Sequence, residues 1–389
     1  MGMRICVGLL SIAAALASLG LADGQAAAAS TTVPINVSDN AQSVVDANPP
    51  GTTFLIQAGT HSGFSVVPKT GDVFDAQPGA VLDGGGVTSD AFDAFGEHRQ
   101  ADDVTVAGAS VQSRLLITNY TDGTSPVGRT IATSQGDLFA NGWILDALEI
   151  ANNTSEGIGI SNTMVVEYCY IHDNGRLGIG GGGTGGSITD NVIDHNAYDY
   201  SSAVEEEAGG IKVEGTNLSI SDNDIESNNA PGIWTDLGAT GITITGNIVE
   251  ANRIGVHVEI SHNVDITNNT IEDNSGPGVR ISGSNNVNVE DNVITGSAGG
   301  VLIDEYNRGS GPEGARVVQD VAVEGNTIEN SGITGIATGL PAGTVITFNF
   351  DQYGTGDTFE WNGSHTASFL KFQQLSGQEP DGSYQSSAT

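Results

Sequence analysis

Residues 231–282 read PGIWTDLGATGITITGNIVEANRIGVHVEISHNVDITNNTIEDNSGPGVRIS and contain the pattern Gly-Φ-x-Φ-x, where Φ is usually an apolar residue, starting at Gly232, Gly255 and Gly278. The same pattern recurs along the chain every 21 to 23 residues, apart from two longer steps. Its first residues are Gly157, Gly178, Gly210, Gly232, Gly255, Gly278, Gly300 and Gly335. A fixed period of about 22 residues predicts a repeat protein in which each repeat forms one coil.

A second pattern, Asn-x-Φ-x-x-Asn, follows the same period. It begins at Asn191, Asn223, Asn247 and Asn269, and it continues in weaker form at Asn292 and Asn326. Short alternating apolar stretches without helical spacing indicate several short strands per coil. Asn and Gly suit tight corners that need a positive φ, and stacked Asn side chains can bond one another from coil to coil. We therefore predict an all-β fold, a single-stranded right-handed parallel β-helix solenoid; a β-sandwich would not keep so strict a period.

Both ends of such a solenoid need caps that cover the open strand edges. Residues 39–48 indicate a short helix with Asp39 or Asn40 as its N-cap. Towards the other end, two aromatic-rich strands precede a short amphipathic helix. The expected organisation is a signal peptide at 1–29, an N-terminal cap at 30–53, the β-helix at 54–343, a C-terminal cap at 344–377 and a disordered tail at 378–389.

The N-terminus has the features of an export signal, namely Arg4, an apolar stretch over residues 5–22 and small residues at 26–29 for cleavage. A retained membrane anchor is the alternative, because 18 apolar residues nearly span a bilayer. We expect cleavage, and hence a secreted protein at the cell surface or in the medium, with no membrane contact afterwards. Cleavage would remove Cys6 and leave Cys169 alone, so no intrachain disulfide can form.

The charge balance excludes several classes of partner. The 389 residues include 12 Lys and Arg against 47 Asp and Glu, for a formal net charge of −35. Such a chain repels the phosphates of nucleic acids and the anionic surface of a membrane. The 38% of hydrophobic residues are enough for a large core. We expect a monomer.

The repeat also predicts where chemistry could take place. In each Gly-Φ-x-Φ-x strand the Φ side chains point inward and the x side chains point outward on one sheet face. On the central coils, the first outward column is Lys212, Trp234, His257 and Arg280. The second column is Glu214, Asp236, Glu259, Ser282 and Asp304. The neighbouring coils carry mostly Gly or small residues, so we predict a functional site on the outward face of residues 210–305.

Two insertions in the repeat, 194–209 and 304–319, flank this face and can form walls of a binding groove. A groove with an exposed Trp, carboxylates and cations suits a polysaccharide, because a sugar ring stacks on the aromatic face while polar groups bind its hydroxyls. The candidate substrate-binding residues are Trp234, Glu207, Glu214, Asp304 and Tyr306. The expected partner is therefore a polysaccharide or another glycan.

The candidate catalytic residues are Lys212, Asp236, His257, Glu259 and Arg280. In a hydrolase, two carboxylates would act as acid and as base or nucleophile, and the coil spacing allows both retaining and inverting separations. In β-elimination or epimerisation, a cation or metal would neutralise a uronate carboxylate while a lysine, histidine or arginine takes the proton at C5. Stacked carboxylates could also bind Ca²⁺. The alternative interpretation is a set of surface ion pairs that contribute little.

The chain resembles the secreted right-handed parallel β-helix proteins of the pectin-lyase-like superfamily, over about residues 35–377. The segments that carry the resemblance are Leu177-Gly178-Ile179-Gly180, Glu207-Ala208-Gly209-Gly210-Ile211-Lys212, Pro231-Gly232-Ile233-Trp234-Thr235-Asp236, Glu259-Ile260-Ser261, Phe359-Glu360-Trp361-x-Gly363 and Phe372-Gln373-Gln374. The resemblance implies a polysaccharide lyase, hydrolase or epimerase, although a fold alone does not assign a reaction.

The sequence also departs from well-known members of that superfamily. The succession Asn-Thr-Asp, Asp-Asp and Gly-His-Gly of polygalacturonase-like hydrolases is absent from its consecutive coils, and so is the Asp-Pro-His motif of alginate epimerases. The leading hypothesis is a secreted polysaccharide-active enzyme. The alternatives are a non-catalytic glycan-binding protein and a purely structural extracellular solenoid.

Overall fold

The computed structural model describes residues 32–88, 90–94, 101–121, 129–132, 141–198, 208–306, 308–336, 340 and 343–385, with the backbone alone for 129–132. The predicted signal peptide at 1–29 and the candidate residue Glu207 lie outside the described residues. Neither described helix is long and apolar enough to cross a membrane.

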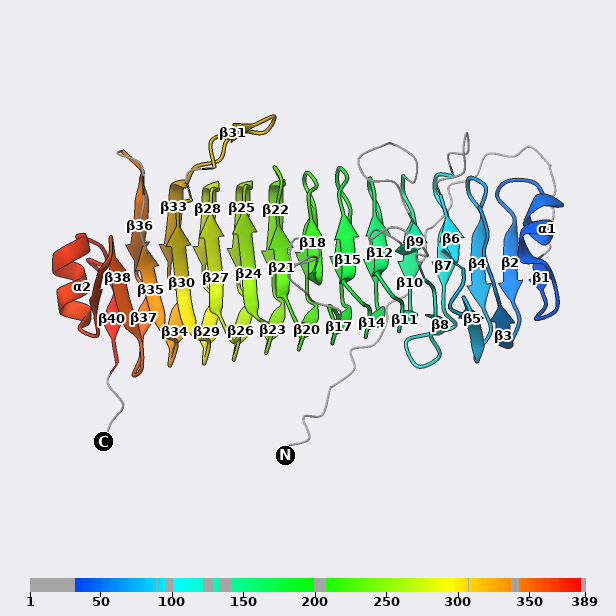
Figure 1. Cartoon of the computed structure of the whole chain (residues 1–389), viewed down its shortest axis with the longest axis horizontal. Helices are drawn as coiled ribbons and strands as arrows, with labels where there is room; N and C mark the ends of the chain where they lie inside the picture. The colour runs from blue at the N-terminus through cyan, green and yellow to red at the C-terminus, as the bar shows by residue number, and fades with distance from the viewer. Residues whose placement is uncertain are drawn as a thin grey trace, which may run out of the picture. The chain divides into compact units, whose positions relative to one another are not determined.

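Within the described part of the chain, the strands form three long sheets that run along the stack of coils (Figure 1). Each regular coil gives one strand to each sheet, and each strand pairs in parallel with the equivalent strand one coil away. Sheet A contains β1 (Val33–Ile35), β2 (Thr53–Ile56), β4 (Val73–Ala76), β7 (Thr105–Ala107), β10 (Ile144–Asp146), β13 (Val165–Glu167), β16 (Ser187–Thr189), β19 (Ser219–Ser221), β22 (Thr240–Thr245), β25 (His262–Thr267), β28 (Asn285–Glu290), β33 (Gln319–Glu324) and β36 (Ile346–Asn349).

Sheet B lies next along each coil. It contains β3 (Gly59–Ser62), β5 (Ala80–Asp83), β8 (Leu115–Thr118), β11 (Leu148–Ala151), β14 (Tyr170–His172), β17 (Val192–Asp194), β20 (Asp224–Glu226), β23 (Ile248–Glu250), β26 (Thr270–Glu272), β29 (Val293–Thr295), β34 (Thr327–Glu329), β37 (Gln352–Tyr353) and β40 (Ser383–Tyr384).

Sheet C is built from the Gly-Φ-x-Φ-x segments and carries the predicted site. It contains β6 (Phe92–Asp93), β9 (Arg129–Ala132), β12 (Glu156–Ile160), β15 (Leu177–Gly181), β18 (Gly209–Val213), β21 (Pro231–Thr235), β24 (Ile254–Glu259), β27 (Pro277–Ser282), β30 (Gly299–Asp304), β35 (Ile333–Ile336), β38 (Thr358–Trp361) and β39 (Ser364–Thr366). Only the last pair, β38 with β39, is antiparallel. The all-β right-handed β-helix predicted from the repeat is confirmed.

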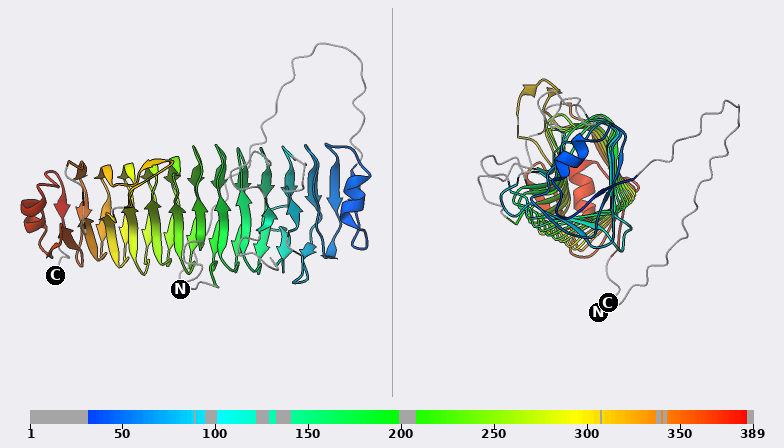
Figure 2. Two further views of the ribbon diagram at one scale, coloured as in Figure 1. Left: turned by 45° about the horizontal axis from the view of Figure 1, so that its top comes forward. Right: turned by 90° about the vertical axis from the view of Figure 1, so that its right-hand side faces the viewer.

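Alternation along the strands fills the interior with apolar side chains. In sheet C, for example, Ile211, Ile233 and Val256 stack on adjacent coils and are fully buried. The buried side chains of all three sheets form one continuous core from Ile35 to Phe372. A view along the stack shows the sheets around this single interior (Figure 2). Because most inward positions are apolar, we look for function on the outer faces and in the insertions.

Two internal ladders of asparagine side chains hold successive coils together. In one ladder, the Nδ2 groups of Asn223, Asn247 and Asn269 each donate to the Oδ1 of the next Asn at 2.9–3.0 Å. The prediction that stacked Asn side chains bond from coil to coil is therefore confirmed. The positive φ that we expected at these corners belongs to the preceding residue instead, for example Asp222 (φ 57°) and Asn268 (φ 56°).

The two ends contain the helices expected there. Helix α1 (Ala41–Asp46) has Asn40 as its N-cap, whose side chain accepts a hydrogen bond from the backbone N–H of Ser43. Helix α2 (Phe369–Ser376) buries Phe372 against the last coil. The segment 378–385 differs from the expected disordered tail. It adds β40 to sheet B and buries the side chain of Glu379.

Candidate functional site

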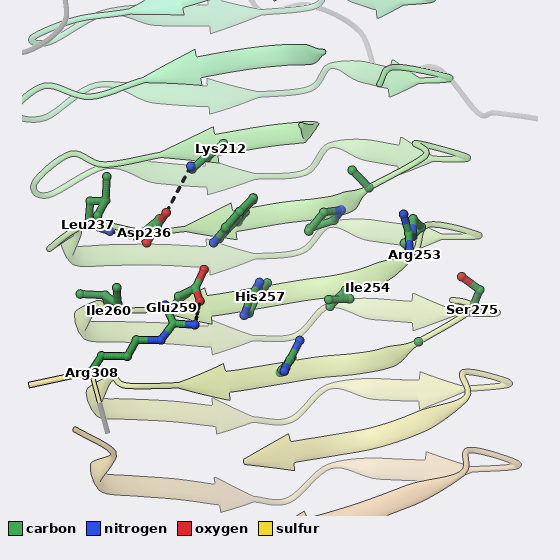
Figure 3. A pocket seen from close by; sticks show the side chains of 15 residues that line it. Lys212, Asp236, Leu237, Arg253, Ile254, His257, Glu259, Ile260, Ser275 and Arg308 are labelled. Carbon is green, nitrogen blue, oxygen red and sulfur yellow. Dashed lines mark hydrogen bonds and ion pairs between the residues drawn. The ribbon is translucent and has the colours of Figure 1, made fainter. Parts of the chain in front are cut away.

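The first outward column of sheet C has the predicted register. Lys212 pairs with Trp234, Trp234 with His257 and His257 with Arg280 on adjacent strands β18, β21, β24 and β27. All four side chains line one cavity. Figure 3 shows two of them, Lys212 and His257, projecting from the outer face of sheet C. The cavity has a volume of about 770 Å³. The repeat period thus brings together side chains that lie more than 20 residues apart in sequence.

The site is more enclosed than the sequence indicated, because we expected a solvent-exposed face. Lys212 is 3% exposed, and Trp234 and His257 are each 6% exposed. Asp236, Glu259 and Asp304 in the second column are also buried. Side chains on adjacent coils pack against one another, and so only their edges remain accessible.

Three ion pairs neutralise most charges of the site. Lys212 Nζ lies 3.2 Å from Asp236 Oδ2. Arg280 donates to Asp304 Oδ2 through Nε at 3.1 Å and through a terminal nitrogen at 3.0 Å. The third pair is Arg308 with Glu259, shown in Figure 3. Since buried charges are costly unless paired, these contacts explain how the carboxylates tolerate burial.

Trp234 lies between two neighbours and cannot serve as the sugar-stacking platform that we predicted. Lys212 Nζ lies 4.2 Å from the centroid of its ring. His257 stacks against Trp234 with a centroid distance of 5.4 Å and an interplanar angle of 20°. Because the two flanking coils occupy its ring faces, only the edge of the indole is available to a ligand.

His257 is the neutral group of the cavity. Burial and, to a smaller extent, the cations Arg280, Arg308 and Lys212 together lower the pKa of its imidazole to about 3. Its Nε2 is buried and has no hydrogen-bond partner among the described residues. In the unfolded chain His257 would bind a proton at its ordinary pKa of 6.5, whereas in the folded state it stays neutral until about pH 3. The folded state therefore loses stability as the pH falls from 6.5 towards 3.

The pKa values of two buried carboxylates, Glu259 and Asp304, are shifted in the opposite direction. Burial raises the pKa of Glu259, and Asp236 adds to this, while Arg308 opposes it. Burial also raises the pKa of Asp304, against the effect of Arg280. Each carboxylate therefore depends on its arginine to remain charged.

The remaining predicted residues lie at the border of the cavity or beyond it. Glu214 is partly exposed, with its Oε1 at 3.9 Å from Lys212 Nζ. Tyr306 is half-exposed on the segment that follows β30, and its hydroxyl donates to Asp304 Oδ2 at 3.1 Å. The short hairpin of β31 (Ser310–Gly311) and β32 (Gly314–Ala315) continues this segment.

Sequence reasoning missed two residues of the site. Arg308 lies within the insertion 304–319, and the repeat gives no register for a residue outside the coils. Arg253, which also lines the cavity, lies in the corner before β24 and so outside both outward columns. The signal that could have found Arg253 is its positive charge, because the chain has only 12 Lys and Arg.

No group of three or more His, Cys, Asp and Glu side chains in the described part of the chain is placed to hold a metal ion. In the candidate Ca²⁺ column, Asp236 and Glu259 are instead paired with Lys212 and Arg308.

The comparisons with known proteins agree with this fold. The family described as the right handed beta helix region matches residues 138–294 and 255–351. Together these segments cover residues 138 to 351, or 214 of 389 positions. The chain belongs to this family. A comparison with curated protein sequences gives no match.

Solved structures with the same fold include pectin-lyase-like β-helix proteins of different activities. The A-module of the mannuronan C-5 epimerase AlgE6 of Azotobacter vinelandii has a TM-score of 0.58 at 17% identity, covering 91% of this chain and 99% of that chain. A mannuronic acid specific polysaccharide family 6 lyase from human gut microbiota has a TM-score of 0.56 at 14% identity, with coverages of 85% and 82%. PfbA, a surface adhesin of Streptococcus pneumoniae, has a TM-score of 0.51 at 11% identity, with coverages of 83% and 85%. At these identities the likeness shows the fold alone.

Proposed function

We propose that this protein is a secreted enzyme that acts on an acidic polysaccharide by removing a proton from a uronate residue, as a lyase or an epimerase does. The observation that carries the proposal is a neutral histidine, His257, with an unpartnered buried nitrogen in a cavity lined by cations. That the fold also occurs in a mannuronan C-5 epimerase and a mannuronic acid specific lyase supports this choice of substrate class. Export through residues 1–29 is part of the proposal.

The charge of the cavity favours an anionic ligand. Lys212, Arg253, Arg280 and Arg308 all line it, which is four of the 12 Lys and Arg in a chain of net charge −35, and they outnumber the two lining carboxylates, Asp236 and Glu259. Elsewhere such a chain repels polyanions, so the site needs local cations to admit a uronate carboxylate. The combined effect of three of these cations on the pKa of His257 indicates a positive potential at that position.

The state of the side chains favours proton abstraction over hydrolysis. A glycosidase needs one carboxyl group that holds a proton for the leaving oxygen. Asp236 and Glu259, the pair that we considered for this role, are held in ion pairs with Lys212 and Arg308, so a leaving oxygen would have to displace a cation to reach either carboxyl group, although burial raises the pKa of Glu259. Of the three bases considered for β-elimination, Lys212 and Arg280 are held in ion pairs, whereas His257 is neutral and can accept a proton.

In the proposed reaction, His257 accepts the proton at C5 while nearby cations compensate the substrate carboxylate. The electron pair of the C5–H bond moves into the carboxylate, where the positive surroundings stabilise it. In elimination this pair forms the C4–C5 double bond as the C4–O bond breaks, and the leaving oxygen takes a proton from solvent. In epimerisation a proton returns to the opposite face of C5. An entering carboxylate would also raise the pKa of His257 towards the range of an effective base.

A screen of the secreted form on a panel of uronate and neutral polysaccharides tests the proposal. We expect either ultraviolet absorbance from unsaturated uronates or deuterium at C5 after reaction in D₂O. New reducing ends without either signal would instead identify a hydrolase. Calcium-supplemented and EDTA-treated samples belong in the same screen, because a bound cation could take part in compensating the carboxylate.

A non-catalytic glycan-binding protein is the second candidate. The three ion pairs of the site support this candidate, because the paired side chains form a polar wall that can bind a sugar without chemical change. Binding of an acidic oligosaccharide with neither absorbance nor deuterium uptake would favour this candidate.

A further inference from the structure

The indole of Trp234 has one unused polar group. Its ring faces are taken by Lys212 on one flanking coil and by His257 on the other. Its Nε1 is buried and has no hydrogen-bond partner among the described residues. A buried N–H without a partner costs about 1–3 kcal/mol, and such groups in native proteins usually have a reason. Trp234 also lines the cavity, so a ligand can supply the missing acceptor.

Another tryptophan of the chain shows how a purely structural indole is satisfied. Trp143 is fully buried in the core, and its Nε1 donates to the backbone carbonyl of Ala101 at 2.6 Å. Trp143 thus has an acceptor within the protein. The unmet donor of Trp234 belongs to the site and not to a general property of buried indoles in this chain.

The chemistry of the neighbours indicates which atom the indole receives. Cations on both sides of Trp234 in the column, Lys212 and Arg280, suit the carboxylate of a uronate. An indole N–H carries no charge, and a hydroxyl oxygen is a matching neutral acceptor. Adjacent coils are about 4.8 Å apart, so side chains on neighbouring coils can contact substituents on opposite sides of one sugar ring.

We propose that Trp234 determines substrate specificity through its edge, with the indole Nε1–H donating to a hydroxyl oxygen of the bound sugar while its two faces position Lys212 and His257. The inference rests on the proposed function, because it assumes an acidic sugar in the cavity. It assigns Trp234 a different role from stacking, since a stacked sugar would need a free ring face.

Two variants distinguish the role of the Trp234 N–H donor from the role of its ring faces. Trp234→Phe keeps an aromatic ring between Lys212 and His257 but removes the N–H donor. We expect KM to rise about tenfold, which corresponds to about 1.4 kcal/mol, with kcat within about twofold of wild type. Trp234→Leu removes both features, so kcat should also fall and its pH dependence should shift, because His257 loses its stacking partner. A residue with only a structural role would not produce this split.

A binding experiment decides the inference without relying on turnover. Wild type labelled with ¹⁵N at its three indoles is titrated with tetramannuronate and with tetragalacturonate, and each affinity is measured by calorimetry. We expect the Nε1–H resonance of Trp234 to shift and to exchange more slowly with water, while that of Trp143 stays fixed. Trp234→Phe, which lacks the resonance and so assigns it, should bind about tenfold more weakly.

Each other outcome is decisive. Binding of a tetrasaccharide with an unmoved Trp234 resonance, or with equal affinity for Trp234→Phe, would overturn the inference alone. Failure of both tetrasaccharides to bind would overturn the proposed function and the inference with it. If Trp234→Phe does not fold, Trp361→Phe assigns the resonance of Trp361 instead. Of the two remaining resonances, the one that stays fixed during the titration belongs to Trp143, and the other belongs to Trp234.

Discussion

At the scale of single residues, the site is a set of buried charges that depend on one another. Sequence periodicity predicted which residues share the column, because a strict repeat places equivalent positions on adjacent coils. It did not predict the pairing of Lys212 with Asp236 or of Arg308 with Glu259. Such pairs depend on side-chain conformation and on a segment outside the repeat, and neither has a periodic signal.

The buried ion pair of Lys212 and Asp236 gives a prediction about stability. Lys212→Met should lower the free energy of unfolding by about 3–5 kcal/mol, because it leaves a buried carboxylate without its cation. Adding Asp236→Asn should restore part of the loss, since the uncompensated charge is then removed. Urea unfolding near neutral pH measures both effects. Lys371→Met, at an exposed position, is the matched control, and an equal effect of the two lysine substitutions would contradict the account.

At the scale of elements, the asparagine ladders explain why the corner positions vary so little along the repeat. Each ladder Asn donates to the next coil and to a backbone carbonyl one coil back, as Asn247 does to Asn269 and to Ile220. The ladder ends at Asp351, whose Oδ1 accepts two bonds from Asn326. The ladder ends there because the Asp351 side chain faces the carboxyl of Glu379 and not another Asn. The sequence pattern predicted the ladder but not its aspartate end.

Removing one ladder residue should be costly. Asn247→Ala should lower the free energy of unfolding by about 3 kcal/mol, because it deletes several buried hydrogen bonds and leaves its neighbours without partners. The matched control is Asn288→Ala, whose side chain makes an exposed bond to Asp265. We expect the control to change stability by less than about 0.5 kcal/mol. Denaturant unfolding compares the two, and a near-neutral Asn247→Ala would show that the ladder contributes little.

The end of the ladder should make the C-terminal coil sensitive to pH. Burial raises the pKa of Asp351, and the facing carboxyl of Glu379 raises it further, so the pair retains a proton. An unfolded chain releases that proton near the ordinary value of 3.8, and the folded state therefore loses stability as the pH rises above about 4. Asp351→Asn can bond to both Asn326 and Glu379 without a proton.

Melting temperatures across pH test this. The free energy of unfolding of Asp351→Asn should equal that of wild type near pH 4 and should be higher by at least about 1 kcal/mol at pH 8, with a correspondingly higher melting temperature. A variant that is equally or less stable than wild type at pH 8 would show that the pair is not protonated in the folded state.

At the scale of the whole molecule, composition and period were enough to predict the β-helix, because each coil repeats the same inward apolar and corner positions. Ile211, Ile233 and Val256 occupy the register that the Gly-Φ-x-Φ-x pattern implies. The irregular parts were harder to predict. Residues 378–385 lack a repeat signal, yet they pair with sheet B and bury Glu379 against Tyr353. Their order comes from contacts that only the complete coil provides.

The net charge of −35 should also affect the whole stack. Like charges on adjacent coils lie within a Debye length at low ionic strength and repel one another. We expect the melting temperature to rise when NaCl is increased from about 10 mM to about 0.5 M. An unchanged or falling melting temperature would mean that the paired cations and hydrogen bonds already offset the repulsion.

The central claim is that His257 removes a proton from an acidic sugar. The most direct measurement is deuterium uptake at C5, or formation of unsaturated uronate, in D₂O by wild type and by His257→Gln, with His365→Gln on β39 as the control. The account predicts that wild type and His365→Gln react, while His257→Gln loses the reaction by about a hundredfold or more and still binds the oligosaccharide. Reaction of His257→Gln at the wild-type rate, or cleavage by wild type without any change at C5, would contradict it.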